Sequence, residues 1–218
     1  MKKNFNNRDG TKVDKPMIAL AGTAADYPHW AHKQFLQILT GSGIFKEVIW
    51  VVSGDRPDKP NLAPANLRAQ MSEALLADML GEGSIRLDLE DTKKSSARFR
   101  TTSELIDEYE AKYRDYEIVI ATGLDLLIPH GGKCEIEATW HNGPELIKRP
   151  IAAVVRPGYK LENEGDLPYN VFIIEGETDK ISSSEGKRMI EEGLPWEHTT
   201  HPGVVAIIKK HNLYGFKA

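Results

Sequence analysis

The chain has 218 residues, of which 40% are hydrophobic and 28% are charged, and 28 Lys and Arg against 32 Asp and Glu give a net charge of −4. This composition is typical of a globular domain and excludes a disordered or fibrous protein. The acidic balance also argues against a nucleic-acid-binding protein, because such a protein needs a basic surface.

The beginning of the chain differs from the rest. Residues 1–15 contain two apolar side chains after Met1, so we expect a flexible tail without a secretory segment, followed by a single domain over 16–218. Apolar runs such as Val48–Val52 are too short to cross a membrane. The single cysteine, Cys134, has no partner for a disulfide or a zinc site. We predict a cytoplasmic protein without a membrane partner, and the sequence leaves a homo-oligomer open.

Short apolar runs rich in Val and Ile alternate with stretches of helical period along the chain. Several runs are apolar at consecutive positions, as expected for strands that are covered on both faces. The pattern predicts an α/β fold, a Rossmann-like doubly wound parallel sheet with helices on both faces. The predicted strands are Met17–Ala21, Val48–Ser53, Ile85–Leu89, Ile118–Ala121, Ile151–Val155 and Val171–Ile174.

Helices are expected between these strands. An apolar stripe predicts one helix over 67–79, and two Ser/Thr-x-x-Glu capping signals, at Thr101 and Ser182, predict the starts of two more. The second of these stops at Gly193, and a last helix covers Val204–His211. Loops are expected after the carboxyl ends of strands, where open parallel sheets bind ligands. They are Gly22–Pro28, Gly54–Pro64, Thr122–Thr139 and Pro157–Tyr169.

Two histidines follow the first strand and its small-residue turn. His29 and His32 are three residues apart, so at a helix start both imidazoles lie on one face beside unpaired backbone N–H groups. This arrangement favours an anion such as phosphate. A metal site would need a third ligand, which the sequence does not place, and a purely structural role stays open.

A second candidate site follows the last strand. If Ser182 caps a helix, Ser183 and Ser184 occupy its first turn, and Lys187 and Arg188 lie on the same side. Hydroxyls, amides and cations would then face one anion. The alternative is an ordinary capped surface helix with solvated basic residues.

These motifs resemble the nicotinate or nicotinamide mononucleotide adenylyltransferases of the nucleotidylyltransferase superfamily. The resemblance covers residues 16–216. The segment from Gly22 to His32 is similar to the family's Gly-Gly-x-Phe-x-Pro-x-His-x-Gly-His motif, and Ile181–Lys187 to its Ile-Ser-Ser-Thr-x-Ile-Arg motif. Three more stretches follow in the family's order: Arg56–Lys59, Thr122–Asp125 and Val155–Tyr159.

The resemblance implies an enzyme of NAD biosynthesis that transfers AMP from ATP, with Mg²⁺, to a pyridine mononucleotide and releases pyrophosphate. The acid and amide forms of the mononucleotide are not distinguished. By the resemblance, four residues would be catalytic, seven would bind ATP and two would contact the mononucleotide, and no protein metal site is expected. These are, in turn, His29, His32, Lys187 and Arg188; Gly22, Thr23, Lys59, Gly123, Asp125, Ser183 and Ser184; and Thr102 and Trp140.

The chain departs from the family pattern at both motifs. Ala24 and Ala25 alter the first turn, which is one residue longer, and Gly186 and Lys187 replace Ile and Arg. Lysine offers a point charge where arginine offers a planar fork. Two alternatives therefore stay open: a nucleotidylyltransferase with another phosphate acceptor, and a nucleotide-binding regulator without turnover. The stretch Gly131–Glu135 is longer than the family's usual loop, with no role assigned.

Overall fold

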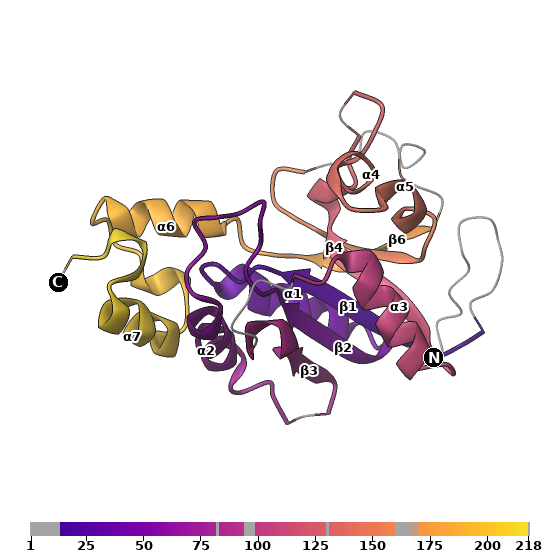
Figure 1. The fold of residues 1–218 in the computed structure, drawn as a ribbon, viewed down its shortest axis with the longest axis horizontal. Helices are drawn as coiled ribbons and strands as arrows, with labels where there is room; N and C mark the ends of the chain where they lie inside the picture. Colours follow the sequence, from indigo (N-terminus) through magenta and orange to yellow (C-terminus); the bar gives the residue numbers. More distant parts are fainter. Residues whose placement is uncertain are drawn as a thin grey trace.

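A computed structural model of the chain describes residues 14–81, 83–93, 99–129, 131–159, 167 and 170–217 (Figure 1). The tail predicted for residues 1–15 therefore lies outside the described residues, except for positions 14 and 15. Most of the predicted loop 157–169 lies outside them as well.

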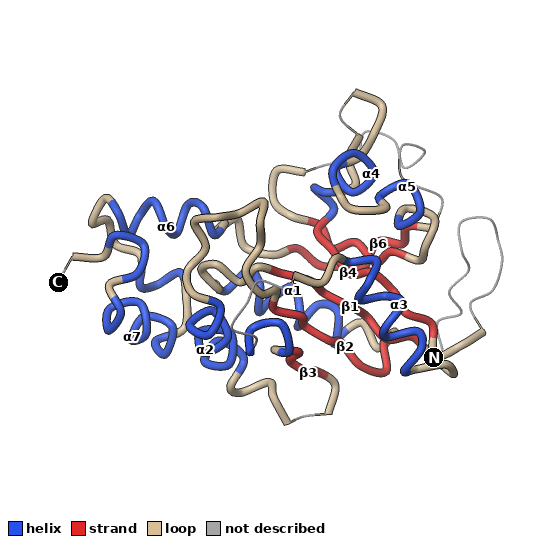
Figure 2. The backbone as a smooth tube through the Cα atoms, viewed as in Figure 1, coloured by secondary structure: helices blue, strands red, loops and turns tan. Residues whose placement is uncertain are grey.

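The described residues form one six-stranded sheet in which every neighbouring pair is parallel (Figure 2). The strand order is β3-β2-β1-β4-β5-β6. The first three strands of the chain therefore follow one another from the centre to one edge of the sheet, and the last three from the centre to the other edge. This confirms the doubly wound prediction and places a topological switch point between β1 and β4. The strands are β1 Met17–Thr23, β2 Phe45–Val52, β3 Ile85–Asp88, β4 Glu117–Gly123, β5 Ile151–Val155 and β6 Val171–Glu177.

Helices cover both faces of this sheet (Figure 1). On one face lie α1 Trp30–Gly41 and α2 Ala65–Leu76, while α7 Pro202–His211 packs on α2 and α6 Ser183–Glu191 on the 3-10 turn Leu213–Gly215. On the other face lie α3 Thr102–Lys112, α4 Glu135–Thr139 and α5 Gly143–Leu146. Each side forms its own apolar core.

Alternation along β1 shows how one strand serves both cores. Ala19 and Ala21 point to the core under α1 and α2, whereas Ile18 and Leu20 point to the core under α3. All four side chains are buried, which explains why the strand is apolar at consecutive positions.

The caps predicted from the sequence are present. Thr101 forms a capping box with Glu104 at the start of α3, and the Ser182 side chain accepts from the Glu185 N–H at the start of α6. Gly193, just past α6, has φ +70°, a left-handed conformation that favours glycine.

Several element ends differ from the prediction by one to three residues, and two regions show why. The helix expected over 67–79 ends at Leu76. Met79 lies in the turn that follows, and its backbone N–H donates to the Leu76 carbonyl. Met79 still packs on the same core, which is why it matched the apolar stripe. The loop expected over Thr122–Thr139 contains the end of β4, a 3-10 turn, Leu124–Leu126, and α4. Its apolar residues were too few to show a helical period.

Candidate active site at the switch point

The two predicted histidines lie side by side at the start of α1. His29 is the N-cap residue, and its backbone N–H donates to His32 Nδ1 at 3.3 Å. The two ring centroids are 3.9 Å apart, and His32 also lies 5.8 Å from the Trp50 ring. His29 is buried and His32 is half-buried. The predicted pairing of the two imidazoles is therefore present.

Both imidazoles are neutral at pH 7. Burial lowers the pKa of His29 far below its usual value, and electrostatic repulsion by Arg156, and by His32 where it is protonated, lowers it further. Burial and the Arg156 charge lower the pKa of His32 to about 4. The pair can therefore donate N–H groups to phosphate without carrying charge, and positive charge has to come from other residues.

The start of α6 packs directly on the loop that precedes the histidines. Ser183 Oγ donates to the Tyr27 carbonyl at 3.1 Å. Gly186 faces the buried Tyr27 ring, and a Cβ at this glycine would lie 2.1 Å from a ring carbon. Tyr27 itself has φ +78°, so the longer first loop turns its ring into the space that Gly186 leaves. The two departures from the family pattern, Gly186 and the longer first loop, are therefore complementary in packing.

The two basic residues of α6 point to different partners. Lys187 Nζ donates to Asp26 Oδ2 at 2.7 Å and is half-buried. Arg188 pairs with Glu192 on the exposed side of the helix, and Ser184 is also exposed. The structure therefore brings Ser183 and Lys187, but not Arg188, to the loop that carries the histidines.

A fully buried arginine joins the loops around this point. Arg68, on α2, donates to the backbone carbonyls of Ala24, Ser53, Gly54 and Ala63. Burial lowers its pKa, while the charges of nearby carboxylates oppose that shift. The Ala24 carbonyl lies in the first loop, those of Ser53 and Gly54 follow β2, and that of Ala63 lies just before α2. Arg68 thus ties three loop segments to one helix.

The end of β4 supplies a carboxylate, Asp125, and the end of β5 a guanidinium, Arg156. Asp125 Oδ2 accepts from Arg156 Nη1 at 2.7 Å, and Asp125 Oδ1 is buried with no hydrogen-bond partner among the described residues. A Cβ at Gly123 would lie 2.2 Å from that Oδ1 atom, so only glycine fits there. Buried carboxylate oxygens normally have a hydrogen-bond partner, so this atom is unusual.

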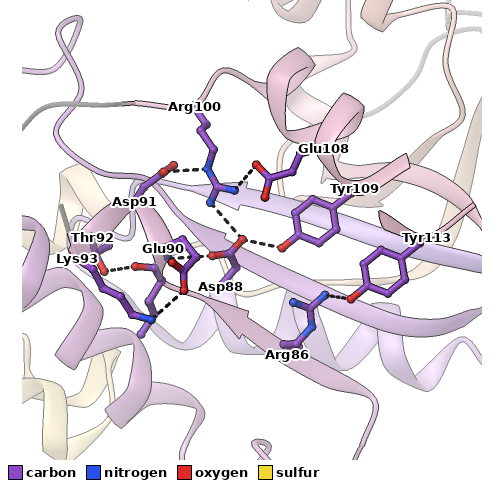
Figure 3. A network of polar contacts seen from close by, with 11 residues as sticks. Arg86, Asp88, Glu90, Asp91, Thr92, Lys93, Arg100, Glu108, Tyr109 and Tyr113 are labelled. Atoms are coloured by element: carbon purple, nitrogen blue, oxygen red, sulfur yellow. Dashed lines mark hydrogen bonds and ion pairs between the residues drawn. The ribbon is translucent and has the colours of Figure 1, made fainter. Parts of the chain in front are cut away.

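The start of α3 is fixed by a network of buried charges (Figure 3). Arg100 pairs with Asp88 at 3.2 Å, with Asp91 at 2.8 Å and with Glu108 at 3.0 Å. Tyr109 Oη donates to the same Asp88 carboxylate at 2.6 Å. These contacts join the end of β3 and the 3-10 turn after it to Arg100, just before α3, and to two side chains within α3.

The two residues predicted to meet the mononucleotide lie near this helix start. Thr102 is the first residue of α3, and the half-buried Trp140 caps the end of α4. Ser103 links the two places, because its Oγ lies 3.3 Å from His141 Nδ1 and 3.4 Å from Asn142 Nδ2.

The remaining predicted residues lie at strand ends or in exposed loops. Thr23 ends β1, and its Oγ1 accepts from the Ala25 N–H at 2.9 Å. Gly22 is exposed and has open space around its α-carbon, and Lys59 is exposed in the segment before α2.

Sequence reasoning missed three residues of this region: Asp26, Arg68 and Arg156. Arg156 lay in a motif that was noted but given no role. Asp26 and Arg68 carried no signal in the chain alone, because their partners are remote in sequence. The described residues contain no group of three or more His, Cys, Asp or Glu side chains that could hold a metal ion. Among the same residues, no helix is both long and apolar enough for a bilayer.

The chain is similar to known proteins over most of its length. A family model described as cytidylyltransferase-like matches residues 20–189. A probable nicotinate-nucleotide adenylyltransferase of Leifsonia xyli is 27% identical over 205 residues, covering 94% of this chain and 96% of that protein. One from Thermus thermophilus with the same description is 29% identical over 203 residues, covering 90% and 98%.

A solved structure shares the fold. It is a Plasmodium falciparum nicotinic acid mononucleotide adenylyltransferase complexed with NaAD, with a TM-score of 0.75 and 22% identity. The match covers 93% of this chain and 98% of that one.

Proposed function

Because the chain belongs to the cytidylyltransferase-like family, we propose that it is a nucleotidyltransferase that transfers AMP from ATP to nicotinate mononucleotide. The products would be nicotinate adenine dinucleotide and pyrophosphate, in NAD biosynthesis. The acceptor follows from the names of the relatives and of the bound ligand in the Plasmodium structure. We choose the acid form of the mononucleotide for the same reason.

This reaction needs no nucleophile from the protein. The 5′-phosphate of the mononucleotide attacks the α-phosphorus of ATP in line, and a P–O bond to the β-phosphate breaks as pyrophosphate leaves. Catalysis then depends on holding two anions together and on stabilising the charge that develops on the leaving group.

The residues divide this work between neutral donors and cations. His29 and His32 would donate uncharged N–H groups to phosphate oxygens, since both are neutral at pH 7. Lys187 and Arg156 would supply positive charge, and Ser183 would donate its hydroxyl to phosphate in place of the Tyr27 carbonyl that accepts it in this structure. Asp125, with its buried unpartnered oxygen, would accept from a hydroxyl of the nucleotide.

The acceptor side would be formed by the start of α3 and the end of α4. We propose that Thr102 contacts the mononucleotide and that Trp140 stacks on the pyridine ring. Gly22, Thr23, Gly123 and the exposed Lys59 would complete the ATP site. Ser184 and Arg188 stay predictions whose side chains the structure does not bring to this group.

Magnesium has no protein cage in the described residues, because no cluster of three potential ligands is present there. We propose that Mg²⁺ enters with ATP, bound to phosphate oxygens and water, and neutralises part of their charge. The protein residues named above would act on the nucleotide and not on the metal.

One observation supports the proposal most strongly. The histidine loop after β1 and Asp125 after β4 lie at the two strands that flank the switch point. Arg156, after β5, pairs with Asp125, and α6 packs on the histidine loop. Ligands of open parallel sheets bind in this crevice.

Pyrophosphate release tests the proposal. The purified chain with ATP, Mg²⁺ and nicotinate mononucleotide should release pyrophosphate, and His32→Ala should lower kcat by about 100-fold or more. Nicotinamide mononucleotide, phosphopantetheine and glycerol phosphate serve as competing acceptors. Turnover with one of the last two would overturn the acceptor, and ATP binding without turnover would indicate a regulator.

We further propose that the protein works in the cytoplasm. We also propose that it binds no nucleic acid, because its net charge of −4 argues against a basic surface. Size-exclusion chromatography with light scattering would decide between a monomer and a homo-oligomer.

A further inference from the structure

We infer that Asp26 is a positioning residue that holds the Lys187 ammonium group beside the histidine loop, where the triphosphate of ATP would bind. This inference rests on the proposed function. Its basis is a contact between residues 161 positions apart, in which Lys187 Nζ donates to Asp26 Oδ2 at 2.7 Å. Neither the family motifs nor the spacing of residues assigned Asp26 a role.

The Asp26 carboxylate is itself fixed on its other side. Its Oδ1 atom accepts from the Ala63 N–H and from Tyr214 Oη, both at 3.0 Å. These two donors come from the segment before α2 and from the end of the chain after α7. Two neutral donors therefore orient one oxygen and leave the other to face Lys187.

Burial of the two partners is unequal. The Asp26 side chain is 3% exposed and the Lys187 side chain 33% exposed. The carboxylate is thus the anchored partner, and the lysine side chain is the partly exposed one. An ammonium has three N–H donors, and the contact with Asp26 takes one of them.

The chemistry of lysine explains why such an anchor is needed. Lys187 occupies the position at which the family that the chain resembles has arginine. The planar guanidinium of arginine binds phosphate with two N–H groups in a fixed geometry. A lysine is a point charge on a flexible four-carbon chain and has no such geometry of its own. Asp26 on one side and the Tyr214 ring, 5.8 Å from Nζ, on another restrict where the charge can lie.

The alternative is a buried ion pair that only stabilises the fold. The two readings differ in what happens when each partner is changed alone. If Asp26 acts through Lys187, removing the Asp26 charge weakens ATP binding only while Lys187 is present. If the pair is merely structural, ATP affinity should stay the same once the variants are shown to be folded.

The test uses Asp26→Asn, Lys187→Met and the double variant in the full chain. Asparagine keeps the size of the side chain but cannot accept from both Lys187 and Ala63. We expect Asp26→Asn to weaken ATP binding, measured by calorimetry, by about tenfold, and to raise KM for ATP more than it lowers kcat. The double variant should bind ATP no more weakly than Lys187→Met.

A matched control is Asp78→Asn, which removes the acceptor of another lysine, Lys33, at 2.6 Å. It should leave ATP affinity within about twofold of wild type. Thermal unfolding of every variant checks that the chain is folded.

Two results would overturn the inference: ATP affinity of folded Asp26→Asn within about twofold of wild type, or effects of the two single changes that add in the double variant. A wild-type chain that binds ATP but releases no pyrophosphate would refute the proposed function alone. A wild-type chain that does not bind ATP would refute both.

Discussion

Two regions of the site are held together in different ways. Around the histidine loop, irregular segments are joined by single long-range contacts, such as Lys187 to Asp26 and the bonds from Arg68 to four backbone carbonyls. At the start of α3, side-chain charges within one stretch, from Asp88 to Tyr109, form a network around Arg100 (Figure 3).

The difference shows how each side of the proposed site is shaped. The region around the histidine loop, the proposed phosphate side, depends on close backbone approach and on a few cations that reach across the fold. The start of α3, on the proposed acceptor side, depends on a local cluster in which three carboxylates surround one guanidinium. Removing that guanidinium leaves buried negative charge, whereas removing one contact on the phosphate side leaves the others in place.

The largest expected effect comes from Arg100→Met. Asp88 and Asp91 are nearly fully buried, so without Arg100 two carboxylates are left without their counter-ion. We expect the free energy of unfolding, measured with urea at pH 7, to fall by about 4 kcal/mol.

Lys93→Met is the matched control for this change. Lys93 forms an ion pair with Glu90 on the same stretch, but both side chains are exposed, so no measurable loss of stability is expected. A comparable loss in the two variants would show that burial of the Arg100 network is not what stabilises the start of α3.

The second expected effect tests close packing on the phosphate side. Gly186→Ala places a Cβ 2.1 Å from the Tyr27 ring, and this ring is fully buried. Because the ring has no free space to move into, we expect a loss of about 3 kcal/mol in urea unfolding.

Gly41→Ala provides the control for this glycine. Gly41 is also helical, and nothing lies within 4 Å of its added Cβ, so its substitution should be close to neutral. Tyr27→Ala combined with Gly186→Ala should cost less than the sum of the two single changes. Additive losses would mean that the two residues do not share this space.

Most of the fold could be predicted from the sequence because its signals are local. Each strand is a short apolar run, and the caps at Thr101 and Ser182 are set by residues three positions apart. The end of α2 could not be predicted, since Met79 packs on the same core from a turn. The short helix α4 has too few turns to show a period.

The candidate site could be predicted only where its residues are neighbours in the chain. The pairing of His29 with His32 follows from their spacing, and the structure confirms that the rings lie together. The choice between Lys187 and Arg188 depends on Asp26, 161 residues away, and the effect of Gly186 depends on Tyr27. No periodicity connects such positions.

Lowering the pH should affect the stability contributions of the two regions differently. Burial alone would raise the pKa of Asp88, but hydrogen bonds from Tyr109 and the Glu90 N–H, with the Arg100 charge, lower it below its usual value. This contribution to stability is present above the unfolded-state pKa, near 3.8, and is lost only as the pH falls below it. Asp88 should therefore add no pH dependence to stability between pH 7 and 5.

The phosphate side should respond in that same range. His32 has a pKa of about 4 in the folded chain and about 6.5 when unfolded, so the unfolded chain binds the extra proton as the pH falls between these values. We expect lowering the pH from 7 to 5 to cost wild type about 2 kcal/mol more than His32→Asn, measured by urea unfolding at both pH values. The variant keeps a polar side chain but cannot titrate. An equal loss in both proteins would place the acid sensitivity elsewhere and remove this distinction between the two regions.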